Sequence, residues 1–106
     1  MEIHGNSNNN EKEHHLYVIY DEEVNDVFKY GISDKVIEED GYSKRMREQV
    51  DYLNRAVGWN RYSAEVLKNG IEGKVNARLL EDEQISAYID RFGRSPRGNV
   101  RTPRPF

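Results

Sequence analysis

Four side chains stand at positions where packing alone would not put them: Tyr17, Lys29, Arg45 and Glu81. Hydrolysis of a phosphodiester with one metal ion needs a base, such as a phenolate or metal-bound water. It also needs cations that steady the phosphate and a carboxylate that holds the metal. The chain contains each of these groups, so phosphodiester cleavage is the chemistry that this set of residues would serve.

Glu81 is expected to share a helix face with apolar residues. It precedes Ile85 by four residues and Tyr88 by seven, whereas Glu83 is rotated from it by about 200° and is expected to face solvent. A carboxylate on a core-facing stripe is costly unless it is paired or bound to a cation. Two interpretations stay open: a metal ligand, or a carboxylate paired with a neighbouring arginine such as Arg78.

The other three side chains have structural interpretations beside the chemical one. Arg45 lies in a basic run, residues 44–47, of the kind that usually forms a solvated helix face. Tyr17 and Tyr20 are three residues apart in a predicted strand and therefore point to opposite faces, which is ordinary strand packing. Lys29 would be explained by a strand whose second face is solvated.

Composition narrows the class of protein. The chain has 106 residues, 36% apolar and 33% charged, which suits one domain with about two layers of secondary structure. Its net charge of -3 excludes a strongly basic nucleic-acid binder but not a local basic patch. Without cysteine, disulfide scaffolds, cysteine-ligated zinc and thiol nucleophiles are excluded. No apolar run approaches the roughly 18 residues of a membrane span, so no membrane partner is expected.

Apolar and β-branched runs predict three strands, at residues 16–20, 27–32 and 62–67. A polar turn of about six residues, 21–26, joins the first two strands into a hairpin. Asn69-Gly70 predicts a turn after the third strand. In the second strand, Gly31 suggests a close backbone approach or a bend. The expected face opposite Lys29 carries Phe28, Tyr30 and Ile32.

Helical periodicity predicts two helices, residues 43–57 and 74–92. The apolar stripe of the first is Met46, Val50, Leu53 and Val57, and that of the second is Ile85, Tyr88, Ile89 and Phe92. Residues 1–14 are polar and predict a flexible linker, and the histidines at its edge, with His4, are expected to be incidental. The predicted fold is α+β: a small three-stranded antiparallel sheet flanked by helices, in the order β-β-α-β-α.

These motifs and their order resemble the GIY-YIG nuclease superfamily, also called the URI fold. The family's Gly-Ile-Tyr motif is matched by His15-Leu16-Tyr17, in which only the tyrosine is retained. Its Tyr-Ile-Gly motif is matched by Lys29-Tyr30-Gly31, similar to the lysine variant frequent in bacterial polymorphic toxins. Ser43-Lys44-Arg45-Met46 carries the arginine of the first helix, and Glu81 matches the glutamate of the second.

The resemblance covers residues 15–99, because the toxin-like branch often closes with a pattern that Gly93, Pro96, Gly98 and Asn99 fit. It implies a nuclease domain over this range, a linker at 1–14 and a basic irregular tail at 100–106. It further implies the toxic tip of a secreted bacterial effector, acting in the cytoplasm of the target cell. The expected partner is a cognate immunity protein, and the domain is expected to be a monomer when free.

The resemblance also implies the reaction: metal-dependent cleavage of nucleic acid, DNA in preference to RNA. Tyr17 would be the general base or would orient the attacking water, and Arg45 would stabilise the pentavalent phosphate and position Tyr17. Glu81 would bind one divalent ion, Mg²⁺. Lys29 would supply positive charge, with Tyr30 as the alternative for the second motif. Because that motif is altered and the chain is acidic, a non-catalytic nucleic-acid- or protein-binding module on the same fold is the alternative function.

The charge distribution predicts a basic strip along the first helix and the C-terminal segment. Residues 91–106 carry five arginines and no acidic residue, which leaves about -8 on residues 1–90 (-3 minus +5). The acidic turns at 21–26 and 38–40 are expected to point away from the site. The residues expected to contact phosphates are Lys44, Arg47, Arg97 and Arg101. A solvated tail is the alternative interpretation of the C-terminal arginines.

Overall fold

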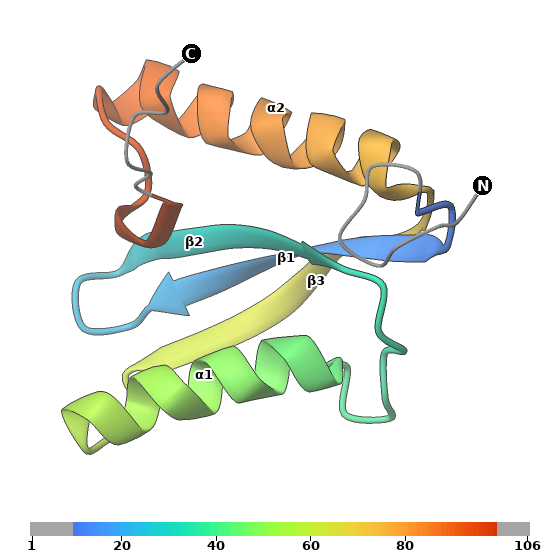
Figure 1. The fold of residues 1–106 in the computed structure, drawn as a ribbon. Coiled ribbons are helices and arrows are strands. Elements are labelled where there is room, and N and C mark those ends of the chain that lie inside the picture. The colour runs from blue at the N-terminus through green and yellow to red at the C-terminus, as the bar shows by residue number, and fades with distance from the viewer. Residues whose placement is uncertain (1–9, 100–106) are drawn as a thin grey trace, which may run out of the picture.

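In the computed structural model, which describes residues 10–99, one antiparallel sheet lies between two helices (Figure 1). The sheet has three strands in the order β2-β1-β3, with α1 on one face and α2 on the other. The elements are β1 (Glu13–Asp21), β2 (Asp26–Ser33), α1 (Lys44–Val57), β3 (Tyr62–Glu72), α2 (Lys74–Phe92) and a 3₁₀ turn, η1 (Arg97–Asn99). The predicted fold class and element order are confirmed.

The fold has three layers, where composition predicted about two, and each layer is correspondingly small. On the α1 face the buried residues are Tyr17, Ile19, Met46, Val50 and Tyr62. On the α2 face they form two smaller clusters: Leu16, Ile71 and Ala77, and then Val18, Tyr30 and Tyr88. A sheet of three strands covers only part of each helix, so the predicted core residues Val57, Ile89 and Phe92 are instead 38%, 40% and 51% exposed.

The N-terminal boundary differs from the prediction of a flexible linker up to residue 14. β1 begins at Glu13, and Asn10 is only 2% exposed. The backbone of Asn10 accepts a hydrogen bond from Lys74 N–H at 2.8 Å, and its side chain donates to Asp34 at 3.1 Å. Hydrogen bonds rather than apolar burial hold this segment, and for that reason hydrophobic patterning did not reveal it. His14 is buried as well, with its Nδ1 bonded to the carbonyl of Lys12.

Irregular pairing with β1 changes two of the predicted strands. The turn predicted at Asn69-Gly70 is wrong, because β3 continues to Glu72 and takes up the two residues as a bulge between the pairs His14–Ile71 and Leu16–Lys68. In β2, Ile19 pairs with Lys29 but Tyr20 pairs with Val27, so Phe28 is the extra residue of a second bulge. The alternation of faces breaks there.

Phe28 therefore does not share a face with Tyr30 and Ile32, as simple alternation predicted. It packs on the α1 face, edge-on to Tyr62 with ring centroids 5.1 Å apart, whereas Tyr30 packs against Val18 on the α2 face. The hairpin is also tighter than expected, because Asp21 and Asp26 pair with each other and leave a loop of residues 22–25.

Both predicted helices form with nearly the predicted bounds. Ser43 caps the N-terminus of α1, where its hydroxyl accepts a hydrogen bond from Met46 N–H, and Gly58 ends the helix in the left-handed conformation at φ 81°. α2 covers all of the predicted range, 74–92. Neither helix of the described residues is long and apolar enough to cross a bilayer.

Candidate active site

Four structural elements meet at a cleft of about 370 Å³ on the open edge of β2. All four of the side chains singled out in the sequence line it: Tyr17 from β1, Lys29 from β2, Arg45 from the first turn of α1 and Glu81 from α2. The structure therefore brings together residues that are up to 64 positions apart in the chain (81 minus 17).

Tyr17 reaches this edge because Gly31 has no side chain. Tyr17 and Gly31 face each other across β1 and β2, and the tyrosine ring lies over the glycine. A Cβ atom on Gly31 would lie 2.4 Å from Tyr17 Cζ and 2.5 Å from its hydroxyl oxygen, far inside van der Waals contact. The close approach predicted at Gly31 is thus the passage of the Tyr17 phenol across β2.

The Tyr17 hydroxyl donates a hydrogen bond to Gln49 Oε1 at 2.5 Å. Burial raises the pKa of this phenol above its ordinary value of 10.0, and the neighbouring Arg45 acts in the opposite direction. The sequence analysis missed Gln49, although it lies one helical turn after Arg45 on the same face of α1 and could have been found from that spacing.

Glu81 is 8% exposed, whereas Glu83 on the same helix is exposed, as the face argument predicted. Among the described residues that line the cleft, Glu81 is the only carboxylate, and Arg78 one turn earlier lines it too. No group of three or more histidine, cysteine or carboxylate side chains suited to a metal occurs within residues 10–99. A single carboxylate fits Mg²⁺, which keeps several waters and commonly binds through one or two carboxylates plus substrate phosphates.

Positive charge surrounds this carboxylate. The cationic side chains that line the cleft are Lys29, Arg45, Lys74 and Arg78. Lys29 is half-buried and shares the α1 face with Tyr17, since it pairs with Ile19 across the hairpin. Tyr30 borders the cleft, but its ring packs on the opposite face with Val18 and Tyr88, so the two candidates for the second motif point to different sides of the sheet.

The C-terminal segment forms one wall of the cleft, and it hydrogen-bonds to the backbone of β2 as a neighbouring strand would. Asn99 accepts a hydrogen bond from Tyr30 N–H at 2.8 Å and donates one to the Tyr30 carbonyl at 2.9 Å. Gly98 permits this contact, because a Cβ atom there would lie 2.7 Å from the Phe28 ring and 2.9 Å from Lys29 Cβ. The Gly-Asn pair noted in the sequence thus fixes η1 against β2.

A family model described as URI fold toxin 2 matches residues 7–93, a range that includes all four candidate residues. The chain belongs to this family. No curated protein and no solved structure matches it. The predicted toxin domain with the URI fold is confirmed, whereas the assignment to the GIY-YIG nucleases and nuclease activity both stay predictions.

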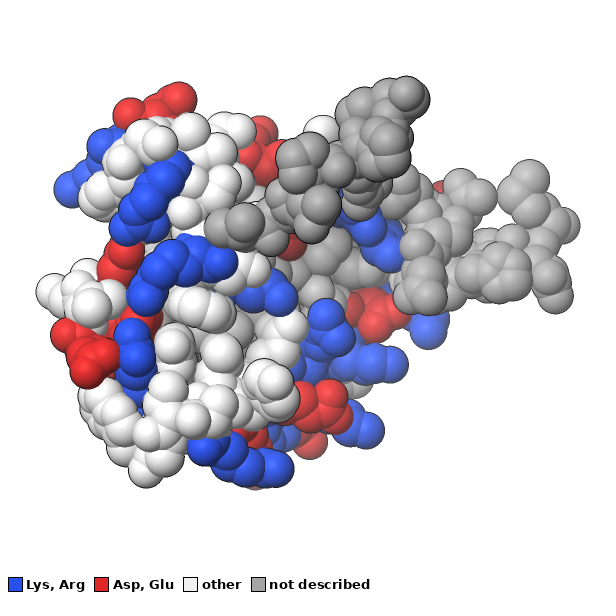
Figure 2. Space-filling view, turned by 60° about the vertical axis from the view of Figure 1, so that its left-hand side comes forward, with Lys and Arg blue, Asp and Glu red and all other residues white. Residues whose placement is uncertain are grey.

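In this URI fold toxin domain the predicted basic strip does not assemble as expected. Arg47 is bonded to Glu38 and, at 2.6 Å, to Asp40, and Lys44 lies 3.8 Å from Glu48. Arg97 pairs with Asp21 at 2.5 Å, and Arg101 lies outside the described residues. The acidic turns that were expected to point away instead hold these arginines. Figure 2 shows basic and acidic side chains interleaved on the face that it presents.

Asp21 anchors the toxin domain's C-terminal segment in a way that the sequence did not indicate. Its side chain is fully buried, with Arg61 donating to both carboxylate oxygens at 2.9 Å and Arg97 donating to one of them. These hydrogen bonds, with that of Arg61 the strongest, hold the pKa of Asp21 well below its ordinary value. Nearby, Asp26 accepts from Arg94 at 2.9 Å.

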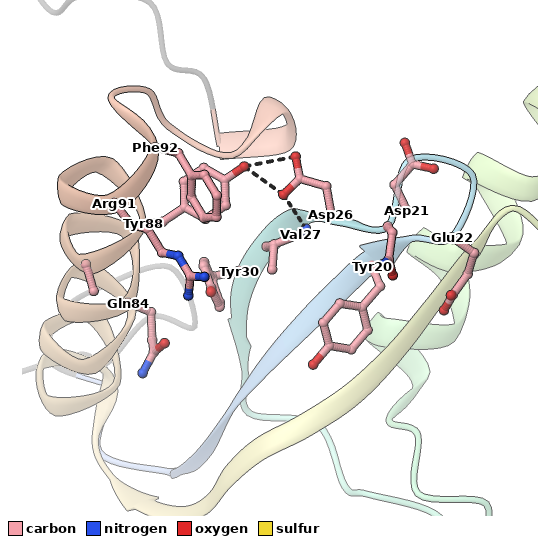
Figure 3. Close-up of a pocket in the computed structure, with 12 residues that line it drawn as sticks. Tyr20, Asp21, Glu22, Asp26, Val27, Tyr30, Gln84, Tyr88, Arg91 and Phe92 are labelled. Atoms are coloured by element: carbon pink, nitrogen blue, oxygen red, sulfur yellow. Dashed lines mark hydrogen bonds between the residues drawn. The ribbon is translucent and has the colours of Figure 1, made fainter.

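A larger pocket of the toxin domain, about 580 Å³, lies between the hairpin and the C-terminal half of α2 (Figure 3). Tyr20, Tyr88 and Phe92 line it together with three carboxylates, those of Asp21, Glu22 and Asp26, and one cation, Arg91. Burial and a 2.6 Å hydrogen bond to Glu65 raise the pKa of Tyr20 to about 12. Carboxylates at this position oppose a phosphate, so the Tyr17 cleft is the better candidate for phosphodiester chemistry.

Proposed function

We propose that this toxin domain is a nuclease that hydrolyses a phosphodiester bond in the Tyr17 cleft, with Mg²⁺ held by Glu81. One observation carries the proposal: Tyr17, Lys29, Arg45 and Glu81, each suited to that chemistry, converge on one cleft from four elements. The cleft has four cations and one carboxylate among its described lining residues, a balance that favours an anionic substrate.

Tyr17 acts through its oxygen rather than as a phenolate. Its proton is engaged with Gln49 and Arg45 donates a hydrogen bond to its oxygen, so one lone pair is left to accept a hydrogen bond from the attacking water. Because burial raises the pKa of Tyr17, the phenol stays protonated at neutral pH. Of the two roles implied by the family resemblance, orienting the water suits this environment better than general base catalysis.

Arg45 and Lys29 steady the phosphate from two sides of the cleft. Preorganised cations are most effective where negative charge grows, here on the oxygens of the pentavalent phosphate. Arg45 is held by the first turn of α1, and Lys29 by a strand whose edge is pinned at Tyr30 by Asn99. Both charges therefore stand on rigid elements.

Glu81 would hold the divalent ion, with water and phosphate oxygens as the other ligands. When bound, Mg²⁺ would supply Lewis acidity at the phosphate and stabilise the leaving oxygen. Glu81 is buried and lies on a long helix, so its carboxylate is held in a fixed position at one side of the cleft.

The substrate proposed is DNA in preference to RNA, and the setting is that of a delivered bacterial effector. The description of the family as a toxin supports the setting. An immunity protein that covers the cleft would protect the producing cell, and the free domain would act as a monomer in the target-cell cytoplasm.

The test is conversion of supercoiled plasmid by the purified domain with Mg²⁺, which we expect to stop with EDTA. Glu81→Gln should abolish cleavage while the melting temperature stays near that of the wild type, and the matched Glu83→Gln should cut normally. A parallel reaction with RNA decides the preferred substrate. Full activity in a folded Glu81→Gln protein would refute the assignment of the metal ligand.

The alternative is a module that binds nucleic acid without cutting it. The observation in its favour is that Lys29, and no tyrosine, takes the α1-face position of the second motif. Salt-dependent binding to DNA, with no cleavage at any Mg²⁺ concentration, would identify this function.

A further inference from the structure

A second cavity, of about 380 Å³, adjoins the Tyr17 cleft at the end where α2 begins. The two cavities share Arg45, Lys74 and Ile32 in their linings. The second one adds Lys12 from the segment before β1 and Lys35 from the loop after β2. We call this cavity the lysine pocket, after Lys12, Lys35 and Lys74.

The lysine pocket is strongly cationic. Besides Arg45 and the three lysines, its charged lining is Asp34, with His14 beside it. Asp34 accepts a hydrogen bond from Asn10, which with the nearby lysines lowers the pKa of its carboxyl. Within residues 10–99, none of the three lysines comes within 4.0 Å of a carboxylate oxygen. Their charges are therefore available to an external anion.

The backbone beneath these lysines is fixed by hydrogen bonds. Lys12 N–H donates to Asn10 Oδ1 at 3.0 Å, and its carbonyl accepts from Gly73 at 3.2 Å. Lys35 N–H donates to Ser33 Oγ at 3.0 Å, and Lys74 N–H donates to the Asn10 carbonyl at 2.8 Å. Segments from three parts of the chain are thus held together, and this arrangement of the backbone places all three lysines in the lining of one pocket.

We propose that the lysine pocket binds the backbone phosphate next to the one that is cut, on the strand held in the Tyr17 cleft. This rests on the proposed function, because it assigns a second phosphate of the same substrate. Arg45 and Lys74 line both cavities and so stand between the two phosphates. The carboxylates beyond Tyr30, on the other side of the cleft, would repel a phosphate. The substrate's nucleic-acid strand therefore runs from the Tyr17 cleft toward Lys12 and Lys35.

The first experiment measures binding without cleavage. Fluorescence anisotropy of a labelled DNA duplex in EDTA gives the affinity over a range of salt concentrations. The double variant Lys12→Gln/Lys35→Gln removes two exposed lysines, and we expect the salt slope to become shallower by about 0.9, because the contact with one phosphate is lost. The matched control, Arg55→Gln/Lys68→Gln, removes the same charge at two exposed basic residues outside both cavities and should retain the wild-type slope.

A second experiment locates the phosphate. Single uncharged methylphosphonates are placed in turn at each phosphate around the cleavage position. One neighbouring position should weaken binding of the wild type but leave binding of Lys12→Gln/Lys35→Gln unchanged, because the partner charge is already absent. Equal losses for both proteins at every position would overturn the proposal.

The outcomes separate this inference from the proposed function. Cleavage with an unaltered salt slope in the double variant would overturn the lysine pocket and leave the nuclease in place. A shallower slope in a protein that never cuts would support the pocket as a phosphate site and refute the nuclease. A lower melting temperature in the double variant would show a folding defect, and the single variant Lys35→Gln then decides the matter: a shallower salt slope supports the pocket, and an unaltered slope overturns it.

Discussion

Replacing Gly31 with alanine would place a methyl group in the volume that the Tyr17 ring occupies. The new Cβ atom would lie 2.4 Å from Tyr17 Cζ, whereas ordinary contact begins near 3.4 Å, so the ring and β2 must separate by about 1.0 Å (3.4 minus 2.4). Overpacking of this kind costs about 1–3 kcal/mol. In a domain of this size that loss lowers the melting temperature by about 4–20 °C.

The same displacement should cost activity beyond the loss of stability. Tyr17 donates to Gln49 at 2.5 Å, and a ring moved by 1.0 Å cannot keep both that bond and its place in the cleft. Misplacement of a reacting group by about 1 Å can reduce the rate by roughly 100-fold. Plasmid cleavage by folded protein, well below the melting temperature, measures this part separately from thermal unfolding.

Two double variants separate packing from chemistry. With Tyr17→Phe already present, Gly31→Ala should still lower the melting temperature, but it should change the remaining cleavage little because the hydroxyl is gone. With Tyr17→Ala present, Gly31→Ala should cost little stability, since the ring that the methyl group meets is absent. A Gly31→Ala protein with wild-type stability and activity would refute the role assigned to this crossing.

Two further predictions concern pH. Tyr17→Phe should reduce the cleavage rate at least tenfold with little change in stability. Because the pKa of Tyr17 is raised above 10.0, the ratio of the wild-type rate to the variant rate should stay constant from pH 6.5 to 9. A ratio that grows tenfold per pH unit would show that Tyr17 acts as a phenolate base. Asp21→Asn should lower stability at pH 7 by about 3 kcal/mol, because it leaves Arg61 and Arg97 without their buried partner. Since folding lowers the pKa of Asp21, its contribution is complete above the ordinary value of 3.8 and is lost as pH falls below it. Thermal melts should therefore show that the difference in stability between the wild type and Asp21→Asn is smaller at pH 2.5 than at pH 7. A difference that stays constant with pH would contradict this account.

The features that the sequence predicted well are local ones. Helical periodicity is set within a few turns, so it located α2 and distinguished Glu81 from Glu83. The predicted range 43–57 matches α1 closely for the same reason, because the periodicity and the caps of a helix depend on nearby residues. Gly31 indicated a close approach, although nothing local showed that Tyr17 was the group approaching.

The features that the sequence did not reveal depend on distant partners. The bulge at Phe28 exists only in relation to β1, so alternation within β2 could not predict it. Asn10 is buried through hydrogen bonds to Asp34 and Lys74, which polar composition could not distinguish from a linker. The pairing of Arg97 with Asp21 joins residues 76 positions apart, so counting charges placed a basic strip where the folded chain has ion pairs.

The two hydrogen bonds between Asn99 and Tyr30 have a consequence for self-association. β2 is an edge strand, and such strands offer their outward backbone groups to other chains as a template for aggregation. At Tyr30 both groups are occupied by the Asn99 amide, and Pro96 beside this segment is fully buried. A second molecule could pair with β2 at Tyr30 only if the segment that contains Asn99 were first displaced. A chain shortened before Asn99 would keep its strands, both long helices and the four cations of the cleft. It would lose part of one wall of the cleft and would expose unpaired backbone groups at the sheet edge, so we expect poor solubility beside any loss of activity.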